Sequence, residues 1–162
     1  MFGADVIARN YKNKAIQPFF HHELFHLYHT RTFNDCRAVW CNLWNEGLAT
    51  YVSHRRKPKA SDDELLLNSP APLRPAVEAN RSKAVCAALE RLDSGESKDN
   101  NALFTSGQPI DGLPRRFGHY VGYLIAAEAG KNRSLKELAQ LNNAQVRPLV
   151  EKSLRNLASC GA

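Results

Sequence analysis

Apolar residues recur at helical spacing along most of the chain, and this pattern predicts a mainly helical protein. The longer predicted helices cover residues 18–30, 37–54, 76–92 and 115–129. A short helix is expected after Ser134, and a final helix contains Pro148 in its early part. A short strand is predicted at residues 2–9, where Val6 and Ile7 are the apolar centre.

Several segments between these helices are polar or rich in proline. Ser61-Asp62-Asp63-Glu64 predicts one more helix start, because serine can cap a helix and acidic side chains suit its first turn. Residues 69–75, 94–101 and 103–114 are predicted to be connectors or loops. Gly130 is expected to end the helix at 115–129, and Ser134 with Glu137 predicts a capping box.

The two N-terminal helices differ in their patterns. The helix at residues 18–30 has Pro18 in its first turn, where a missing N–H costs little. The helix at residues 37–54 carries two tryptophans and several aliphatic residues on more than one face, so we expect it to be largely buried.

Composition limits the class of protein. A chain of 162 residues, with 43% hydrophobic and 23% charged residues, fits one globular domain. The formal charge is +6, but Arg55-Arg56-Lys57 is its only tight basic cluster, so we expect no nucleic-acid partner. No apolar run approaches the roughly 20 residues of a membrane span.

The four cysteines, Cys36, Cys41, Cys86 and Cys160, contain no C-x-x-C pair, which argues against a cysteine zinc site. Cys36 and Cys41 are close enough to form a disulfide within a loop, while four free thiols are the ordinary alternative. The even number favours an exported protein, periplasmic or extracellular.

Candidate chemistry starts with His22-Glu23-x-x-His26 in the first long helix. Two histidines four residues apart lie on one helical face, so both imidazoles can reach one metal ion. Glu23 follows the first of them, where it can act as general base toward a water at that ion. The alternative is a histidine-rich surface helix.

Glu46 is the best candidate for a third ligand. It lies twenty positions after His26 in a helix otherwise rich in Trp, Leu and Val, where a carboxylate is normally paired or metal-bound. The alternative is that Glu46 lies on the exposed side of its helix.

HHELFH followed by WNEGLATY resembles the zinc-binding motifs of the gluzincins, the thermolysin-like and aminopeptidase-like metallopeptidases. The resemblance covers residues 18–54. It implies Zn²⁺ as cofactor, His22, His26 and Glu46 as its ligands, and Glu23 as general base. The segment PRRFGHYVGYLIAAEAGK resembles, more loosely, a group of small predicted zinc-dependent proteases.

Two positions depart from the gluzincin pattern. Thermolysin-like enzymes have an aspartate four residues after the glutamate ligand, and this chain has Thr50, which can make a weaker hydrogen bond to a ligand histidine. Aminopeptidase-like members place the tyrosine of Tyr-x-x-Gly opposite the metal to stabilise the oxyanion. His119-Tyr120-Val121-Gly122 matches that segment, so His119 ranks first as the oxyanion donor, before Tyr120 and Tyr123.

Three further side chains have open interpretations. His29 shares the helical face of His22 and His26, but about 10 Å of helix rise separates it from His22, so we expect it to support the site or lie on the surface. Arg115 and Arg116 can bind a substrate carboxylate, or can simply be solvated at a helix start.

The sequence therefore predicts a single zincin-like metallopeptidase domain over residues 1–162. Its fold class is mainly α (zincin-like α+β), with an active-site helix, a glutamate helix and a C-terminal helical bundle. We expect the sheet to be small or truncated at the N-terminus. The expected function is zinc-dependent hydrolysis of a peptide or protein substrate. The alternative is a catalytically inactive zincin-like domain that binds a metal or a partner.

Overall fold

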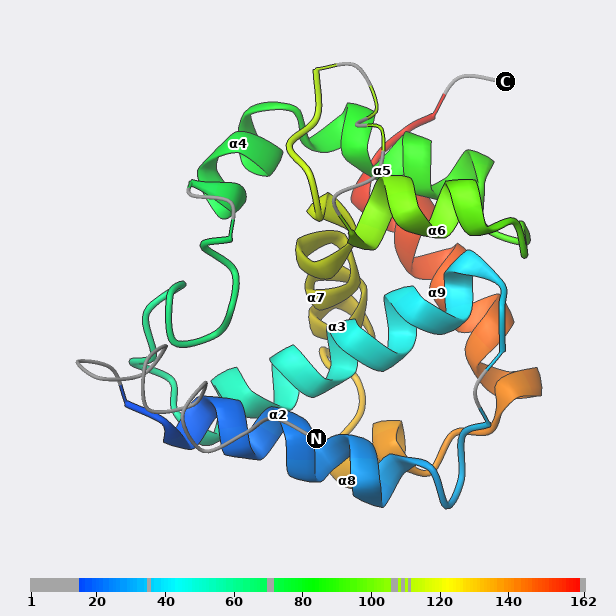
Figure 1. Cartoon of the computed structure of the whole chain (residues 1–162). Helices are drawn as coiled ribbons and strands as arrows, with labels where there is room; N and C mark the ends of the chain where they lie inside the picture. Colours follow the sequence, from blue (N-terminus) through cyan, green and yellow to red (C-terminus); the bar gives the residue numbers. More distant parts are fainter. Residues whose placement is uncertain are drawn as a thin grey trace.

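The computed structural model describes residues 15–34, 36–69, 72–105, 108, 110 and 112–160, and within these ranges all regular elements are α-helices. In chain order they are α2 (Gln17–His29), α3 (Val39–Arg56), α4 (Leu73–Ala79), α5 (Arg81–Glu90), α6 (Ser97–Phe104), α7 (Phe117–Ala129), α8 (Leu135–Ala139) and α9 (Asn143–Leu157) (Figure 1). The prediction of a mainly helical protein is confirmed. The strand predicted at residues 2–9 lies outside the described residues.

Helix α3 is the centre of the fold. It packs against α2 on one side and α7 on another, and it also contacts α6, α8 and α9 (Figure 1). Leu43, Trp44 and Leu48 are fully buried, as the apolar pattern of this helix predicts. Burial on several faces fixes the position of α3, and with it the carboxylate of Glu46.

The crossing of α3 and α7 depends on two glycines. A Cβ atom added to Gly47 would lie 2.1 Å from the carbonyl carbon of Gly122, and one added to Gly122 would lie 2.4 Å from the Leu43 oxygen. These distances leave no room for a side chain, so the two backbones touch directly. The contact brings the start of α7, with His119, close to Glu46 on α3.

The prediction of a helix that starts at Ser61 is wrong, because the segment forms only one helical turn. Ser61 and Glu64 bond to each other's backbone N–H groups as expected of a cap. The turn then closes, since Leu67 N–H donates to the Asp62 oxygen and Leu66 adopts a left-handed backbone with φ of 60°. This is the pattern of a helix C-terminus, so the helix does not continue.

Two other predictions need correction. The helix expected at 76–92 is divided at Asn80, which ends α4 and precedes α5; its side-chain amide bonds to the Ala76 oxygen, as asparagines do at turns. The segment at 94–101, predicted to be a polar loop, contributes to α6. Asn100 joins this helix to Asn42 and to the Arg37 oxygen, a tertiary contact that local composition does not reveal.

The remaining helices follow the predictions closely. Within the predicted range of 115–129, Phe117–Ala129 form α7, which ends before Gly130. Ser134 and Glu137 form the expected capping box at α8. Helix α9 begins at Asn143 behind a second capping box and tolerates Pro148 inside it.

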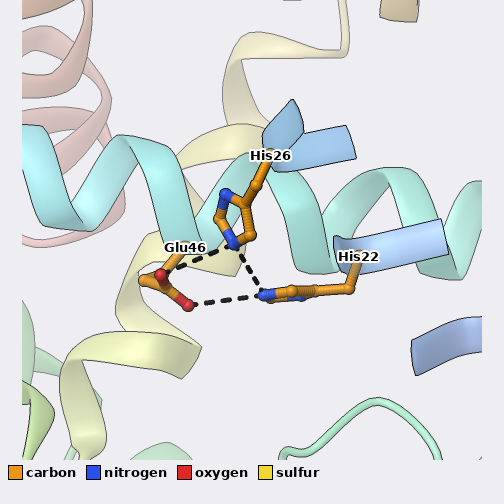
Figure 2. A group of neighbouring side chains, drawn as sticks. All are labelled: His22, His26 and Glu46. Atoms are coloured by element: carbon orange, nitrogen blue, oxygen red, sulfur yellow. Dashed lines mark hydrogen bonds and ion pairs between the residues drawn. The ribbon is translucent and has the colours of Figure 1, made fainter. Parts of the chain in front are cut away.

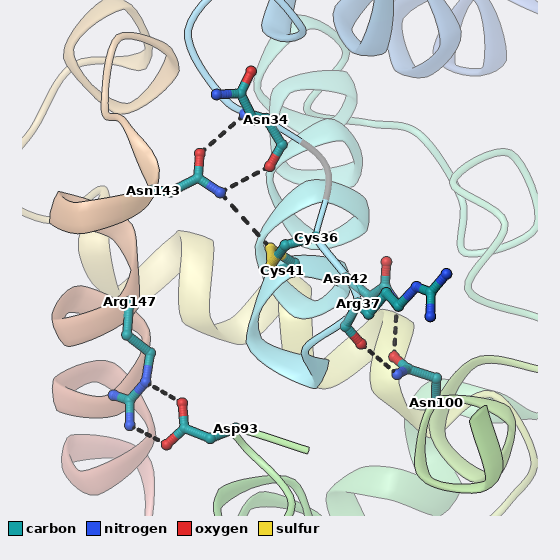
Figure 3. Close-up of a disulfide and its surroundings, with 9 residues drawn as sticks. All are labelled: Asn34, Cys36, Arg37, Cys41, Asn42, Asp93, Asn100, Asn143 and Arg147. Carbon is teal, nitrogen blue, oxygen red and sulfur yellow. Dashed lines mark hydrogen bonds and ion pairs between the residues drawn. A yellow bond between two sulfur atoms is a disulfide. The ribbon is translucent and has the colours of Figure 1, made fainter. Parts of the chain in front are cut away.

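Disulfides join two pairs of segments. Cys36 pairs with Cys41 across the connection from α2 to α3, and Cys86 of α5 pairs with Cys160 beyond α9. Figure 3 shows the contact between α9 and the segment that connects α2 to α3. The Asn143 side-chain amide bonds to the Asn34 backbone and lies beside the Cys41 sulfur. Hydrogen bonds between Asn34 and Asn143 thus hold the loop between the two N-terminal helices against α9, while one disulfide closes this loop on α3 and the other joins α5 to the segment after α9.

Among the described residues, no helix is both long enough and apolar enough to cross a membrane. This agrees with the expectation from the sequence.

Candidate metal centre

Helix α2 presents two imidazoles to the same point. His22 and His26 lie one turn apart on its inner face, and their Nε2 atoms are 3.0 Å apart (Figure 2). The helix runs without a break from Gln17, with Pro18 accommodated in its first turn. Helical periodicity alone therefore accounts for this pair.

Glu46 of α3 brings a carboxylate to the two imidazoles. Its Oε2 atom lies 3.4 Å from His22 Nε2, and its Oε1 atom lies 3.6 Å from His26 Nε2 (Figure 2). One candidate ligand atom from each of the three residues lies within 4.8 Å of the other two. Glu46 therefore lies beside the two histidines and not on an exposed side of its helix.

Neighbouring side chains set the tautomers of the two histidines. The Asn45 side-chain oxygen can only accept, and it lies 3.2 Å from His26 Nδ1. Thr50 donates its hydroxyl hydrogen to the Glu46 backbone oxygen, so it accepts at 3.5 Å from His22 Nδ1. Both Nδ1 atoms then carry a hydrogen, and both Nε2 atoms face Glu46.

Electrostatics keep these groups in the forms that bind metal ions. Burial opposes charge on Glu46, but hydrogen bonding and attraction from His22, with further attraction from His119 and His26, lower its pKa to about 2. Burial and the neighbouring His22 lower the pKa of His26. A charged carboxylate and a neutral imidazole are the protonation states of metal ligands.

A cavity of about 300 Å³ opens beside these three side chains. Glu23 lines it, one residue after His22 and on the same helix. Its other walls are the turn at Leu65, Leu66 and Leu67, and the start of α7 at Arg116 and His119. The cavity is thus lined by three candidate metal ligands, an acid–base candidate, an apolar wall and a cation.

His119 reaches the centre from α7. Its Nδ1 atom lies 3.6 Å from Glu46 Oε2, and its Nε2 atom lies 3.3 Å both from Arg116 Nη2 and from the Phe104 oxygen. Arg116 can only donate and the Phe104 oxygen can only accept, so in a neutral ring Nε2 bonds to one of the two. The charge of Arg116 makes its bond the stronger one, and with Nε2 accepting from Arg116 the hydrogen lies on Nδ1, facing Glu46. Burial, then the charge of Arg116, lower the pKa of His119 to about 4, so at neutral pH it is a neutral donor.

Tyr120 is not brought into the cavity. Its hydroxyl donates to the Glu78 carboxylate, and its ring stacks on that of Tyr123 beneath the Arg74 guanidinium. Tyr123 in turn bonds to His54. Neither tyrosine lines the cavity, because both turn toward α4 and the end of α3.

His29 supports the site from inside the core. Its ring is buried between Phe25 and Phe33, at 4.9 Å from each, and its Nδ1 atom lies 3.4 Å from the Asn45 oxygen. His26 and His29 therefore share one acceptor. This matches the expected supporting position of His29 and not the surface one.

The sequence pattern does not predict that the turn at Leu65, Leu66 and Leu67 forms a wall of the cavity. Leu66 and Arg116 are the non-glycine residues with positive φ among the described residues, and both line the cavity. Strained backbone of this kind is concentrated at functional sites. No local pattern in the sequence signals it, because neither residue type favours that conformation.

Comparisons with protein-family models, with curated proteins and with solved structures find no match to this chain.

Proposed function

We propose that the protein is a zinc-dependent peptidase that uses one metal ion and a glutamate base. The observation that carries this proposal is the meeting of His22, His26 and Glu46 beside a cavity that Glu23 also lines. Two histidines and one glutamate are a ligand set of catalytic zinc, which leaves one position open for water or substrate.

The donor set fits zinc in its spacing and chemistry. Bonds of about 2.0–2.1 Å in a tetrahedral site place ligand atoms about 3.3 Å apart. The separations in this cluster are 3.0, 3.4 and 3.6 Å. In addition, two imidazole Nε2 atoms and a carboxylate converge here, an arrangement that a cation between them stabilises.

Zinc bound there would supply an acidified water and polarise the substrate carbonyl. Glu23 would accept a proton from the attacking water and pass it to the leaving amine. His119 would donate its Nδ1 hydrogen to the carbonyl oxygen as negative charge develops on it. Asn45 and Thr50 would keep the two histidines oriented.

The proposal extends to fold and location. We infer that α2 and α3 are the helical part of a zincin-like α+β domain of the gluzincin type. The two disulfides support an oxidising compartment outside the cytosol.

The test is Glu23→Gln, compared with wild type after both are loaded with zinc. We expect the variant to bind one zinc ion with unchanged affinity while kcat/KM on a peptide library falls about 10²- to 10⁴-fold. Metal content by elemental analysis and peptide cleavage by mass spectrometry measure the two properties separately.

Full activity of Glu23→Gln would remove the glutamate from the mechanism. If zinc-loaded wild type cleaves no peptide, the rival function of a metal- or partner-binding domain without catalysis replaces the proposal.

A further inference from the structure

The cavity contains one feature that metal binding and proton transfer do not use. Arg116 lines it and is the one cationic side chain among its lining residues in the described chain. Its backbone is in the left-handed region, with φ of 62°, directly before α7. Rare backbone conformations are concentrated at functional sites, and a guanidinium at a cavity wall can bind a ligand of opposite charge.

The guanidinium still has free bonding capacity. Nη1 donates to the Ser69 oxygen at 3.1 Å, and Nη2 donates to His119 Nε2 at 3.3 Å. A guanidinium carries five N–H donors, so these two bonds leave others for a ligand. The two bonds also fix the position of the planar group, which makes it a rigid site for a carboxylate.

Distance limits where that carboxylate can be in a substrate. The contact from Arg116 to His119, the imidazole ring, and the 3.6 Å contact to Glu46 place Nη2 within about 9 Å of Glu46 Oε2. A terminal carboxylate one residue beyond a scissile carbonyl lies about 4 Å from it, and a hydrogen bond adds about 3 Å. The sum of about 7 Å suits a single residue between the reacting carbonyl and Arg116, while a second residue would lengthen it to about 10.5 Å.

We propose that Arg116 binds the C-terminal carboxylate of the substrate, so that the site removes single C-terminal residues. This inference rests on the proposed peptide hydrolysis and deepens it. Leu65, Leu66 and Leu67 line the same cavity, so the departing residue has an apolar side chain. The volume of about 300 Å³ is at the small end of ligand pockets, which suits a chain end better than a long peptide.

The binding test uses the zinc-loaded Glu23→Gln protein, which holds the substrate without turnover. The probes are an N-acetylated tripeptide that ends in leucine and the same peptide with a C-terminal amide. Charge-assisted hydrogen bonds predict that the acid binds about 10- to 100-fold more tightly than the amide. Adding Arg116→Gln removes that preference. Equal binding of the two peptides to Glu23→Gln overturns the proposal.

Arg115→Gln is the matched control, because Arg115 is the exposed neighbour and does not line the cavity. It removes the same charge from the start of α7 and should leave the preference intact. If Arg116→Gln acted only by releasing His119, it would weaken turnover of acid and amide equally. The ratio between the two peptides therefore separates carboxylate binding from support of His119.

Turnover by the zinc-loaded wild type separates this inference from the proposed function. We expect release of free leucine from the acid and about 10- to 100-fold slower reaction of the amide. Cleavage of both at equal rates overturns carboxylate recognition but keeps the peptidase. A binding preference for the acid without any hydrolysis keeps the carboxylate site and removes the peptidase.

Discussion

The three candidate metal ligands are held in place by neighbouring side chains. Asn45 accepts from both His26 and His29, while Thr50 accepts from His22. The bond between Thr50 and His22 is long, at 3.5 Å, so the threonine holds its histidine less firmly than an aspartate would. The resemblance to the gluzincin motif predicts this weaker bond, since Thr50 occupies the position of an aspartate there, whereas the shared use of Asn45 depends on how α2 lies on α3.

His29 should make stability depend on pH. Burial lowers its pKa from 6.5 to about 4, so between these values the unfolded chain binds more protons than the folded one. Above pH 6.5 both states are neutral, and as pH falls toward 4 the folded state loses stability. For a shift of this size the loss is about 2 kcal/mol at pH 5.

His29→Phe keeps the aromatic stack with Phe25 and Phe33 but cannot titrate. We expect its free energy of unfolding to fall about 2 kcal/mol less than that of wild type between pH 7.5 and pH 5. Urea denaturation of the metal-free proteins at both pH values measures the difference. Equal losses in the two proteins would show that His29 is not the group responsible.

At the scale of elements, the distance between α3 and α7 is set by Gly47 and Gly122. Gly122→Ala should favour the helix intrinsically by about 1 kcal/mol. Its Cβ would, however, lie 2.4 Å from the Leu43 oxygen, and that backbone cannot move without displacing a buried helix. We expect a net loss of about 3 kcal/mol in the free energy of unfolding, measured by urea denaturation.

Gly95→Ala is the control for this change. Its added Cβ would meet only the Arg37 side chain, at an ordinary 3.7 Å. A loss from Gly122→Ala no larger than that from Gly95→Ala would contradict the close crossing of the two helices.

Some features of the fold and the site can be predicted from the sequence, and others cannot. His22, His26 and Glu46 follow from helical spacing and from the cost of burying a carboxylate, and the structure brings them together. Local sequence does not predict the turn after Ser61 or helix α6. In the first, Leu66 adopts a conformation that leucine rarely takes; in the second, Asn100 bonds to residues distant in sequence. Tertiary contacts support both, through the Arg74–Asp62 ion pair at the turn and the Asn100 bonds at α6, and local propensity does not contain such contacts.

For the whole molecule, the two disulfides should contribute unequally to stability. Cys86 and Cys160 are 74 positions apart, and Cys36 and Cys41 only five. The loop-entropy model gives about 4 kcal/mol for the long loop and about 2 kcal/mol for the short one. Replacing both cysteines of each pair by alanine, followed by urea denaturation, measures the two values.

The Cys36–Cys41 variant serves as the control for the long-loop variant, since each loses one disulfide and leaves no free thiol from the broken pair. Equal losses would contradict the assignment of the long cross-link between α5 and the C-terminal segment.

The central claim is that one zinc ion binds between His22, His26 and Glu46. The most direct test is elemental analysis of the purified protein, followed by anomalous scattering at the zinc edge from its crystals. We predict one zinc per chain, with a single anomalous peak among these three side chains. A protein that binds no zinc, or a peak elsewhere, would contradict the account.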